Sequence, residues 1–152
     1  MSGRVIVERY AKGLAANDSA VIRECLHPDY VGRYPQSGEV IRGVANRLAI
    51  GENYPGQEQA PLSTSVAQIR GRDDEFVTTP SWNILHLVGS GDEFTLSGTI
   101  NYPNGETWHS VVLITVRDGK IWRETDYFGP PFEAASWRAP FVEQEKAGVS
   151  AE

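Results

Sequence analysis

The chain has 152 residues, of which 40% are hydrophobic and 22% are charged, and its formal net charge is −6 at pH 7. This length suffices for one domain with a buried core, and no run approaches the roughly 20 apolar residues of a membrane span. The acidic balance also opposes nucleic acid binding, which relies on lysine and arginine side chains. We therefore expect one domain over residues 1–142, a frayed tail over 143–152, and neither a membrane nor a nucleic acid partner.

The N-terminal segment reaches Glu8 too early to contain the apolar region of a secretory signal, so we expect a cytoplasmic protein. Cys25 is the single cysteine and cannot form a disulfide within the chain. Its apolar neighbours Val21, Ile22 and Leu26 indicate a packed thiol rather than a nucleophile.

Helical periodicity dominates the first third of the chain. Apolar residues at helical spacing predict a helix over about residues 3–16. Asp18 and its neighbours supply N-cap chemistry for a second helix, which Pro28 is expected to end, so that the two helices form a hairpin. Apolar residues between 44 and 50 predict a third helix that stops before Tyr54.

The rest of the regular structure is predicted to be strand, because β-branched and aromatic residues alternate between turn sequences. The expected strands are Phe76–Val88, Phe94–Tyr102, Trp108–Arg117 and Ile121–Phe128. Pro80 marks a break or edge in the first of them. Helices followed by a strand meander predict an α+β fold, with the helices on one face of a curved, mainly antiparallel sheet and a cavity for a small apolar molecule.

Several short motifs resemble the nuclear transport factor 2-like superfamily, and within it the SnoaL-like proteins, over about residues 4–128. The motifs are Glu8-Arg9-Tyr10, Asn17-Asp18, His27-Pro28-Asp29, Gly43, Arg117-Asp118-Gly119-Lys120-Ile121 and Asp126-Tyr127-Phe128. The resemblance implies a cone of three helices in a strongly curved sheet. It also implies a cavity at one end and a homodimer formed through the outer sheet face.

The superfamily includes ketosteroid isomerases, epoxide hydrolases of the limonene type and polyketide cyclases. The resemblance places the isomerase oxyanion tyrosine on Tyr10 but its general base on Tyr34 and its second acid on Val112, so an isomerase mechanism of that type is rejected. The water-activating aspartate of the hydrolases falls on Asp126, and Tyr34 and Gln36 approximate their water-positioning pair. Their arginine and acid fall on about Thr95 and Ser97, which cannot replace them.

Alternation along the last predicted strand places Glu124, Asp126 and Phe128 on one face, which the resemblance puts inside the cavity. Desolvation and the charge of the neighbouring carboxylate would raise the pKa of one of the two carboxyl groups. A raised pKa would make Asp126 a general base near neutral pH. The alternative is a structural ion pair with one of three arginines. These are Arg117, Arg123 and Arg138.

Two tyrosines, Tyr10 and Tyr34, could donate hydrogen bonds to a substrate oxygen, although a buried tyrosine more commonly packs in the core. The substrate-binding residues expected around the pocket are Gln36, Trp108, Ser110, Val112, Glu124 and Phe128. His109 lies on the opposite face of its strand, with Thr107 and Val111, and is expected at the surface or in a dimer interface.

No metal site is expected, because the three histidines are dispersed, and no cofactor, because the glycines form no phosphate-binding loop. His27 is expected to cap the second helix. The aromatic segments 128–132 and 137–141 are expected to dock on the body, over the cavity mouth or a subunit boundary.

The first functional hypothesis is a cofactor-independent acid/base enzyme of the isomerase, cyclase or dehydratase type, acting on a small apolar carbonyl or hydroxyl compound. Asp126 would move the proton. A water-activating hydrolase is a variant of this hypothesis. The alternative is a non-catalytic ligand-binding or dimerisation module.

Overall fold

The computed structural model describes residues 3–53, 81–101 and 105–145. Its helices are α1 (Gly3–Ala16), α2 (Ser19–Cys25) and α3 (Val44–Glu52), and a short 3-10 helix, η1 (Ser136–Phe141), follows the last strand. The strands are β1 (Leu26–Tyr34), β2 (Glu39–Arg42), β3 (Ser81–Ser90), β4 (Glu93–Asn101), β5 (Thr107–Arg117) and β6 (Lys120–Gly129).

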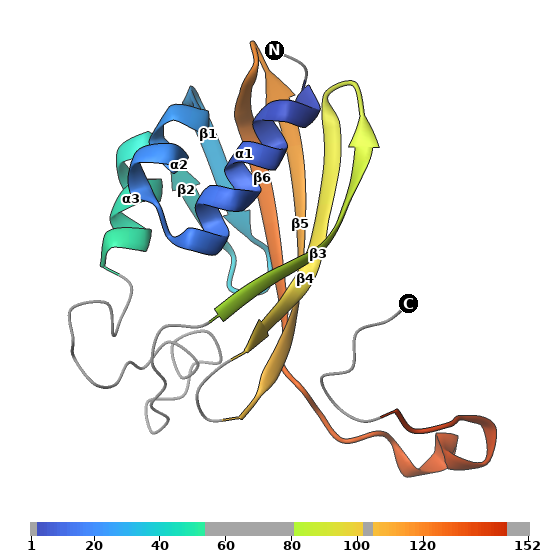
Figure 1. Cartoon of the computed structure of the whole chain (residues 1–152). Coiled ribbons are helices and arrows are strands. Elements are labelled where there is room, and N and C mark those ends of the chain that lie inside the picture. Colours follow the sequence, from blue (N-terminus) through green and yellow to red (C-terminus); the bar gives the residue numbers. More distant parts are fainter. Residues whose placement is uncertain (1–2, 54–80, 102–104, 146–152) are drawn as a thin grey trace.

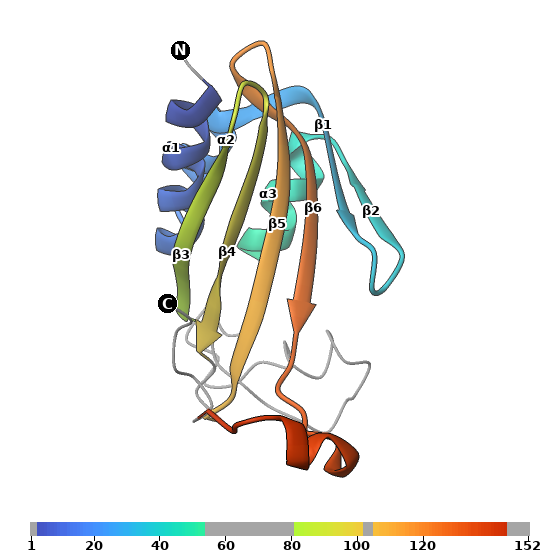
Figure 2. The same ribbon diagram turned by 90° about the vertical axis from the view of Figure 1, so that its right-hand side faces the viewer.

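The strands form one six-stranded sheet in the order β2-β1-β6-β5-β4-β3. Only β1 and β6 run parallel, and the other neighbouring strands run antiparallel. The helices lie on one face of this curled sheet and leave the other face bare (Figures 1 and 2). The predicted α+β fold is confirmed.

The core forms between the helices and the covered sheet face. The buried stripe of α1 comprises Ile6, Val7, Tyr10, Ala11 and Leu14, as its periodicity predicts. Asp18 caps α2, because its Oδ1 accepts hydrogen bonds from the backbone N–H groups of Ala20 and Val21, each at 3.1 Å. Cys25 is fully buried, which confirms the packed thiol.

The prediction that Pro28 ends the second helix, with His27 as its cap, is wrong. The helix ends at Cys25, and both residues belong to β1. The β1–β6 register is interrupted between Leu26 and Val31, so Pro28 lies where no continuous ladder of hydrogen bonds requires its missing N–H. His27 instead accepts a hydrogen bond from the backbone N–H of Asp29 at 2.9 Å.

The remaining predicted strands lie close to their predicted bounds. The turn at 118–119 has the positive φ angles, 51° and 70°, that a tight hairpin between right-twisted strands requires. The beginning of the first predicted strand, Phe76 to Pro80, and the end of the second, Tyr102, lie outside the described residues.

The C-terminal aromatic segment does not dock on the body of its own chain, contrary to the sequence-based expectation. Phe132, Trp137 and Phe141 are 86%, 72% and 81% exposed. The segment leaves the end of β6 and extends away from the sheet (Figure 1). Within the described ranges, no helix is both long and apolar enough to span a membrane.

Candidate functional site

Two carboxylic acids occupy the covered face of β6. Glu124 and Asp126 are 2% and 3% exposed, in line with the predicted alternation. In the sheet register, Gly32 of β1 lies opposite Glu124, and Val112 of β5 lies opposite Asp126. The pair therefore lies in the middle of the sheet, under the helices.

Two tyrosine hydroxyls hold Glu124. Tyr10 of α1 donates a hydrogen bond to Glu124 Oε1, and Tyr30 of β1 donates to the same oxygen at 3.0 Å. Hydrogen bonds to a carboxylate stabilise its charged form. The two hydrogen bonds therefore fix the position of the Glu124 carboxyl group.

The second carboxyl group of the pair, Asp126, has a raised pKa. Burial raises its pKa well above the ordinary range, and the charge of Glu124 and a hydrogen bond with Glu124 raise it further, while Arg47 opposes the shift. No donor from the described part of the chain reaches Asp126 Oδ1. A neutral carboxyl that donates to Glu124 removes the charge repulsion between the two acids.

A buried cation, Arg47 of α3, accompanies the pair and is 7% exposed. Burial lowers the pKa of Arg47, but the surrounding groups, Tyr10 and Glu124 first among them, outweigh burial and raise it, so the guanidinium is charged. Its Nε has no hydrogen-bond partner among the residues that the structure describes. The cluster therefore keeps one unused N–H donor beside the carboxyl pair.

The sequence analysis missed Arg47 and Tyr30. The spacing of Val44, Arg47 and Leu48 is i, i+3, i+4, which places the arginine on the apolar stripe of α3 and could have identified it. Tyr30 lies in β1, between the second and third predicted helices, where no strand was predicted above.

The three arginines proposed as ion-pair partners of the carboxyl pair lie elsewhere, so the ion pairs proposed with them are wrong. Arg117 and Arg123 pack on Trp122, with the guanidinium carbons 4.8 and 4.1 Å from the ring centroid. Arg138 packs against the ring of Trp137. Among the described residues, no ion pair joins Asp126 to any arginine.

Tyr34 and Gln36 lie where the end of β1 meets the end of β6. The Tyr34 ring packs edge-on against Phe128, with 5.7 Å between ring centroids. Burial raises the pKa of Tyr34, and the nearby Asp126 raises it further. Gln36 is exposed, and its Oε1 accepts a hydrogen bond from the backbone N–H of Phe128 at 2.6 Å. Gln36 therefore fixes the strand end that carries Phe128.

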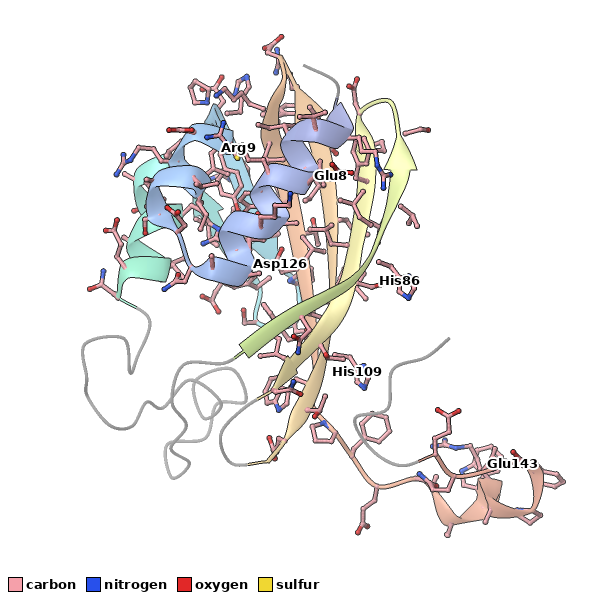
Figure 3. All side chains as sticks on the ribbon, viewed as in Figure 1. Glu8, Arg9, His86, His109, Asp126 and Glu143 are labelled. Carbon is pink, nitrogen blue, oxygen red and sulfur yellow. The ribbon has the colours of Figure 1, made fainter. Side chains whose placement is uncertain are left out.

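The expected apolar wall on β5 is buried on the helix side. Trp108, Ser110, Val112 and Ile114 are each at most 3% exposed. His86 and His109 point away from the helices, whereas Asp126 lies behind α1 (Figure 3). Thr95 and Ser97 share the outer face with Val111 and Leu113, their register partners.

A hollow of about 460 Å³ lies along α1, lined by Glu8, Ala11, Lys12, Ala15 and Leu87. Neither Glu124 nor Asp126 lines it, so a cavity at the carboxyl pair stays a prediction. The described parts of the chain contain no cluster of histidine, cysteine, aspartate and glutamate suited to a metal ion.

Gly32 positions Tyr30, which gives a first prediction. A Cβ at Gly32 would lie 2.5 Å from the Tyr30 hydroxyl oxygen, so Gly32→Ala must displace the group that donates to Glu124. Losing a hydrogen bond to a charged group is expected to cost about 1.5–3 kcal/mol of unfolding free energy, measured by urea denaturation.

Gly51→Ala is the matched control for Gly32→Ala. A Cβ at Gly51, in α3, would make only an ordinary 3.8 Å contact with Asn17. Alanine in a helix is expected to leave stability unchanged or to raise it. Equal effects of the two substitutions would show that Gly32 does not position Tyr30.

The fold and the site together define a small α+β protein, in which helices cover one face of a curled sheet and a tyrosine-held carboxyl pair is buried between them. The SnoaL-like domain family matches residues 7–124, and the chain belongs to that family. No curated protein sequence matches the chain.

Similar solved structures support the fold. A candidate ketosteroid isomerase from Kribbella flavida is 21% identical, with a TM-score of 0.76 over 98% of this chain and 93% of its own. A nuclear transport factor 2-like protein of unknown function from Burkholderia xenovorans is 26% identical, with a TM-score of 0.64 over 95% of both chains. A limonene epoxide hydrolase-like enzyme from M. tuberculosis is 19% identical, with a TM-score of 0.57 over 83% of this chain and 81% of its own.

Proposed function

We propose that this protein is a cofactor-independent acid/base enzyme of the isomerase, cyclase or dehydratase type, acting on a small apolar carbonyl or hydroxyl compound. The observation that carries the proposal is Asp126, a buried carboxyl with a raised pKa that forms no ion pair with an arginine of the described residues. Keeping two acids and a cation inside a core is costly, and such clusters concentrate at functional sites.

The carboxyl pair would supply the proton transfers. Asp126 gives its proton to one atom of the substrate and takes a proton from another, so the enzyme ends as it began and needs no cofactor. Glu124, held by Tyr10 and Tyr30, sets the proton affinity of Asp126. Tyr10 thereby acts through Glu124 instead of touching the substrate oxygen.

The remaining residues would bind the substrate and stabilise charge. Tyr34 and the free Nε of Arg47 donate to the oxygen on which negative charge develops. Four residues form the wall of the binding pocket: Trp108, Ser110, Val112 and Phe128. Gln36 contributes indirectly, because it holds the backbone of Phe128.

The test is hydrogen exchange at carbon. Small enolisable ketones of increasing hydrophobicity, such as cyclohexenone and tetralone, are incubated with the protein in D2O, and deuterium incorporation beside the carbonyl is followed by NMR. The wild type is expected to accelerate exchange, and Asp126→Asn to lose that acceleration by a factor of about 10²–10⁴.

Asp92→Asn is the matched control for the exchange test, because Asp92 is an exposed carboxylate in the β3–β4 turn. This variant should retain the full rate. Absence of wild-type exchange across the series, or full activity of Asp126→Asn, would contradict proton chemistry at this pair.

A non-catalytic binding or dimerisation module is the second candidate. It is favoured by one observation, the nearly complete burial of Glu124 and Asp126, which a purely structural network would share. Such a module would gain thermal stability from an apolar ketone without catalysing exchange. The hydrolase variant is less well supported, because the Gln36 carbonyl oxygen already accepts from Phe128 and Thr95 and Ser97 face outward.

We also propose a homodimer formed through the bare sheet face. Four large apolar side chains near the middle and edge of that face, Val88, Val111, Leu113 and Tyr127, are 38–59% exposed. In the strand registers Val111 lies opposite Tyr127 and next to Leu113 along β5, and Thr95 of β4 separates Leu113 from Val88. A monomer would leave this patch in water.

A further inference from the structure

The C-terminal arm, residues 130–145, carries aromatic surface that its own chain does not cover. Phe132, Trp137 and Phe141 form its aromatic triad, and each is more than two thirds exposed. The η1 turn gives this segment a defined shape, and the Arg138 guanidinium lies 5.6 Å from the Trp137 ring centroid. Three large aromatic side chains held in water along one short segment mark a contact surface for another molecule.

The arm and the bare sheet face lie on the same side of the molecule. The arm leaves the end of β6 and projects to the side opposite the helices (Figure 1). Seen from that side, the uncovered sheet faces the viewer and the arm passes beneath it (Figure 2). Anything that packs on the bare face therefore lies within reach of the arm.

Charge also matches the arm to the bare face. The described arm carries three exposed glutamates, Glu133, Glu143 and Glu145, and one arginine, Arg138. Four arginines belong to strands of this sheet: Arg33, Arg42, Arg117 and Arg123. Arg117 and Arg123 pack on the ring of Trp122. Arg117 also forms an ion pair with Asp118 at 3.9 Å, so Arg33, Arg42 and Arg123 supply the positive charge of this face.

We propose that the arm binds a second copy of this chain. Its aromatic triad would pack on the apolar patch of the second copy's bare sheet face, and its glutamates would lie near the arginines of that face. Residues 130–135 span roughly 20 Å when extended, and the six residues of η1 add roughly 12 Å, whereas a ten-residue strand is roughly 33 Å long. The arm can therefore follow the length of a facing sheet. This inference rests on the proposed dimer and is independent of the proposed chemistry.

The first experiment compares dimer dissociation constants by sedimentation over a range of protein concentrations. The triple variant Phe132→Ala, Trp137→Ala, Phe141→Ala is expected to raise the dissociation constant at least about tenfold, because buried aromatic anchors dominate interfaces. The triad is exposed within one chain, so circular dichroism should show an unchanged fold. Ile50→Ser, a partly exposed apolar position on α3, is the control and should dimerise as the wild type does.

The outcomes separate the two proposals. A wild type that stays monomeric at every concentration overturns both the dimer and the arm. A triple variant that dimerises as tightly as the wild type overturns the arm alone. Raising the salt concentration should weaken the wild-type dimer if the glutamates and arginines meet, since salt screens exposed charges.

A second experiment locates the arm. The photoreactive residue p-benzoylphenylalanine replaces Trp137, and the irradiated protein is separated under denaturing conditions. A crosslinked product of twice the chain mass is expected, joined to a peptide from β3, β5 or β6. Crosslinks confined to one chain would mean that the arm covers its own body, and would overturn the proposal.

Discussion

Asp126→Asn is expected to leave the protein at least as stable as the wild type at pH 7. The wild type must keep a proton on Asp126 in the folded state, because burial and the charge of Glu124 raise its pKa. The unfolded chain ionises this group with a pKa of roughly 3.9. Ionisation therefore stabilises the unfolded state alone, and each unit of pKa elevation removes about 1.4 kcal/mol of wild-type stability.

The direction of the Asp126 pKa shift determines the pH range over which the two proteins differ in stability. Below the unfolded pKa, Asp126 is protonated in both states, and its contribution to stability is fully present. As pH rises from about 4 toward 7, the wild type loses stability relative to the variant, and the difference levels off above the raised folded pKa. Asparagine can donate an N–H to Glu124 in place of the carboxyl proton and has no charge to bury.

Urea midpoints of the wild type and Asp126→Asn, taken from pH 4 to pH 8, measure this difference. Infrared spectroscopy provides a second readout, since the carbonyl band of a protonated carboxyl should be present near neutral pH and absent from the variant. A clear loss of stability in Asp126→Asn at pH 7 would mean that an ionised Asp126 holds Arg47, and the proton-carrying role would then be wrong.

Adding Glu124→Gln to Asp126→Asn is expected to cost about 3–5 kcal/mol at pH 7, because it leaves the buried Arg47 without a neighbouring anion. Glutamine keeps an oxygen that can accept from the hydroxyls of Tyr10 and Tyr30, so the loss is mainly one of charge. The double background is needed, because Asp126 could otherwise ionise and replace Glu124 as the counter-ion.

Urea denaturation measures this cost, and a third substitution tests its cause. Arg47→Met removes the stranded cation while filling a similar apolar volume, so the triple variant should recover much of the lost stability. Glu52→Gln, at the exposed end of α3, is the control and should change stability by no more than about 0.5 kcal/mol. Failure of Arg47→Met to restore any stability would mean that Arg47 is not balanced by Glu124.

The sequence by itself determined the local structure and the direction of most side chains. Period-2 alternation placed Glu124 and Asp126 on the face opposite Arg123 and Tyr127, and helical periodicity placed Tyr10 on the buried stripe of α1. These properties depend on neighbours in the chain and on the geometry of one element, so a single sequence carries them.

Only the tertiary structure decided the partners of the carboxyl pair. Tyr30, Arg47 and Glu124 are far apart in the chain, and the parallel pairing of β1 with β6 and the packing of α3 bring them together. An arginine on a short helix is ordinarily exposed or partly buried, and so is a tyrosine near a proline. Their burial follows from which elements pack together, and local spacing does not encode that choice.

The surroundings of the C-terminal arm also depend partly on the sequence and partly on the tertiary structure. Its aromatic composition predicts that Phe132, Trp137 and Phe141 are to be covered, since apolar surface is unfavourable in water. Which surface covers them depends on where the end of β6 directs the chain, and it directs the arm away from its own core. Composition therefore favours a covered position for these side chains, whereas the direction of the chain after the sheet leaves them exposed on its own body.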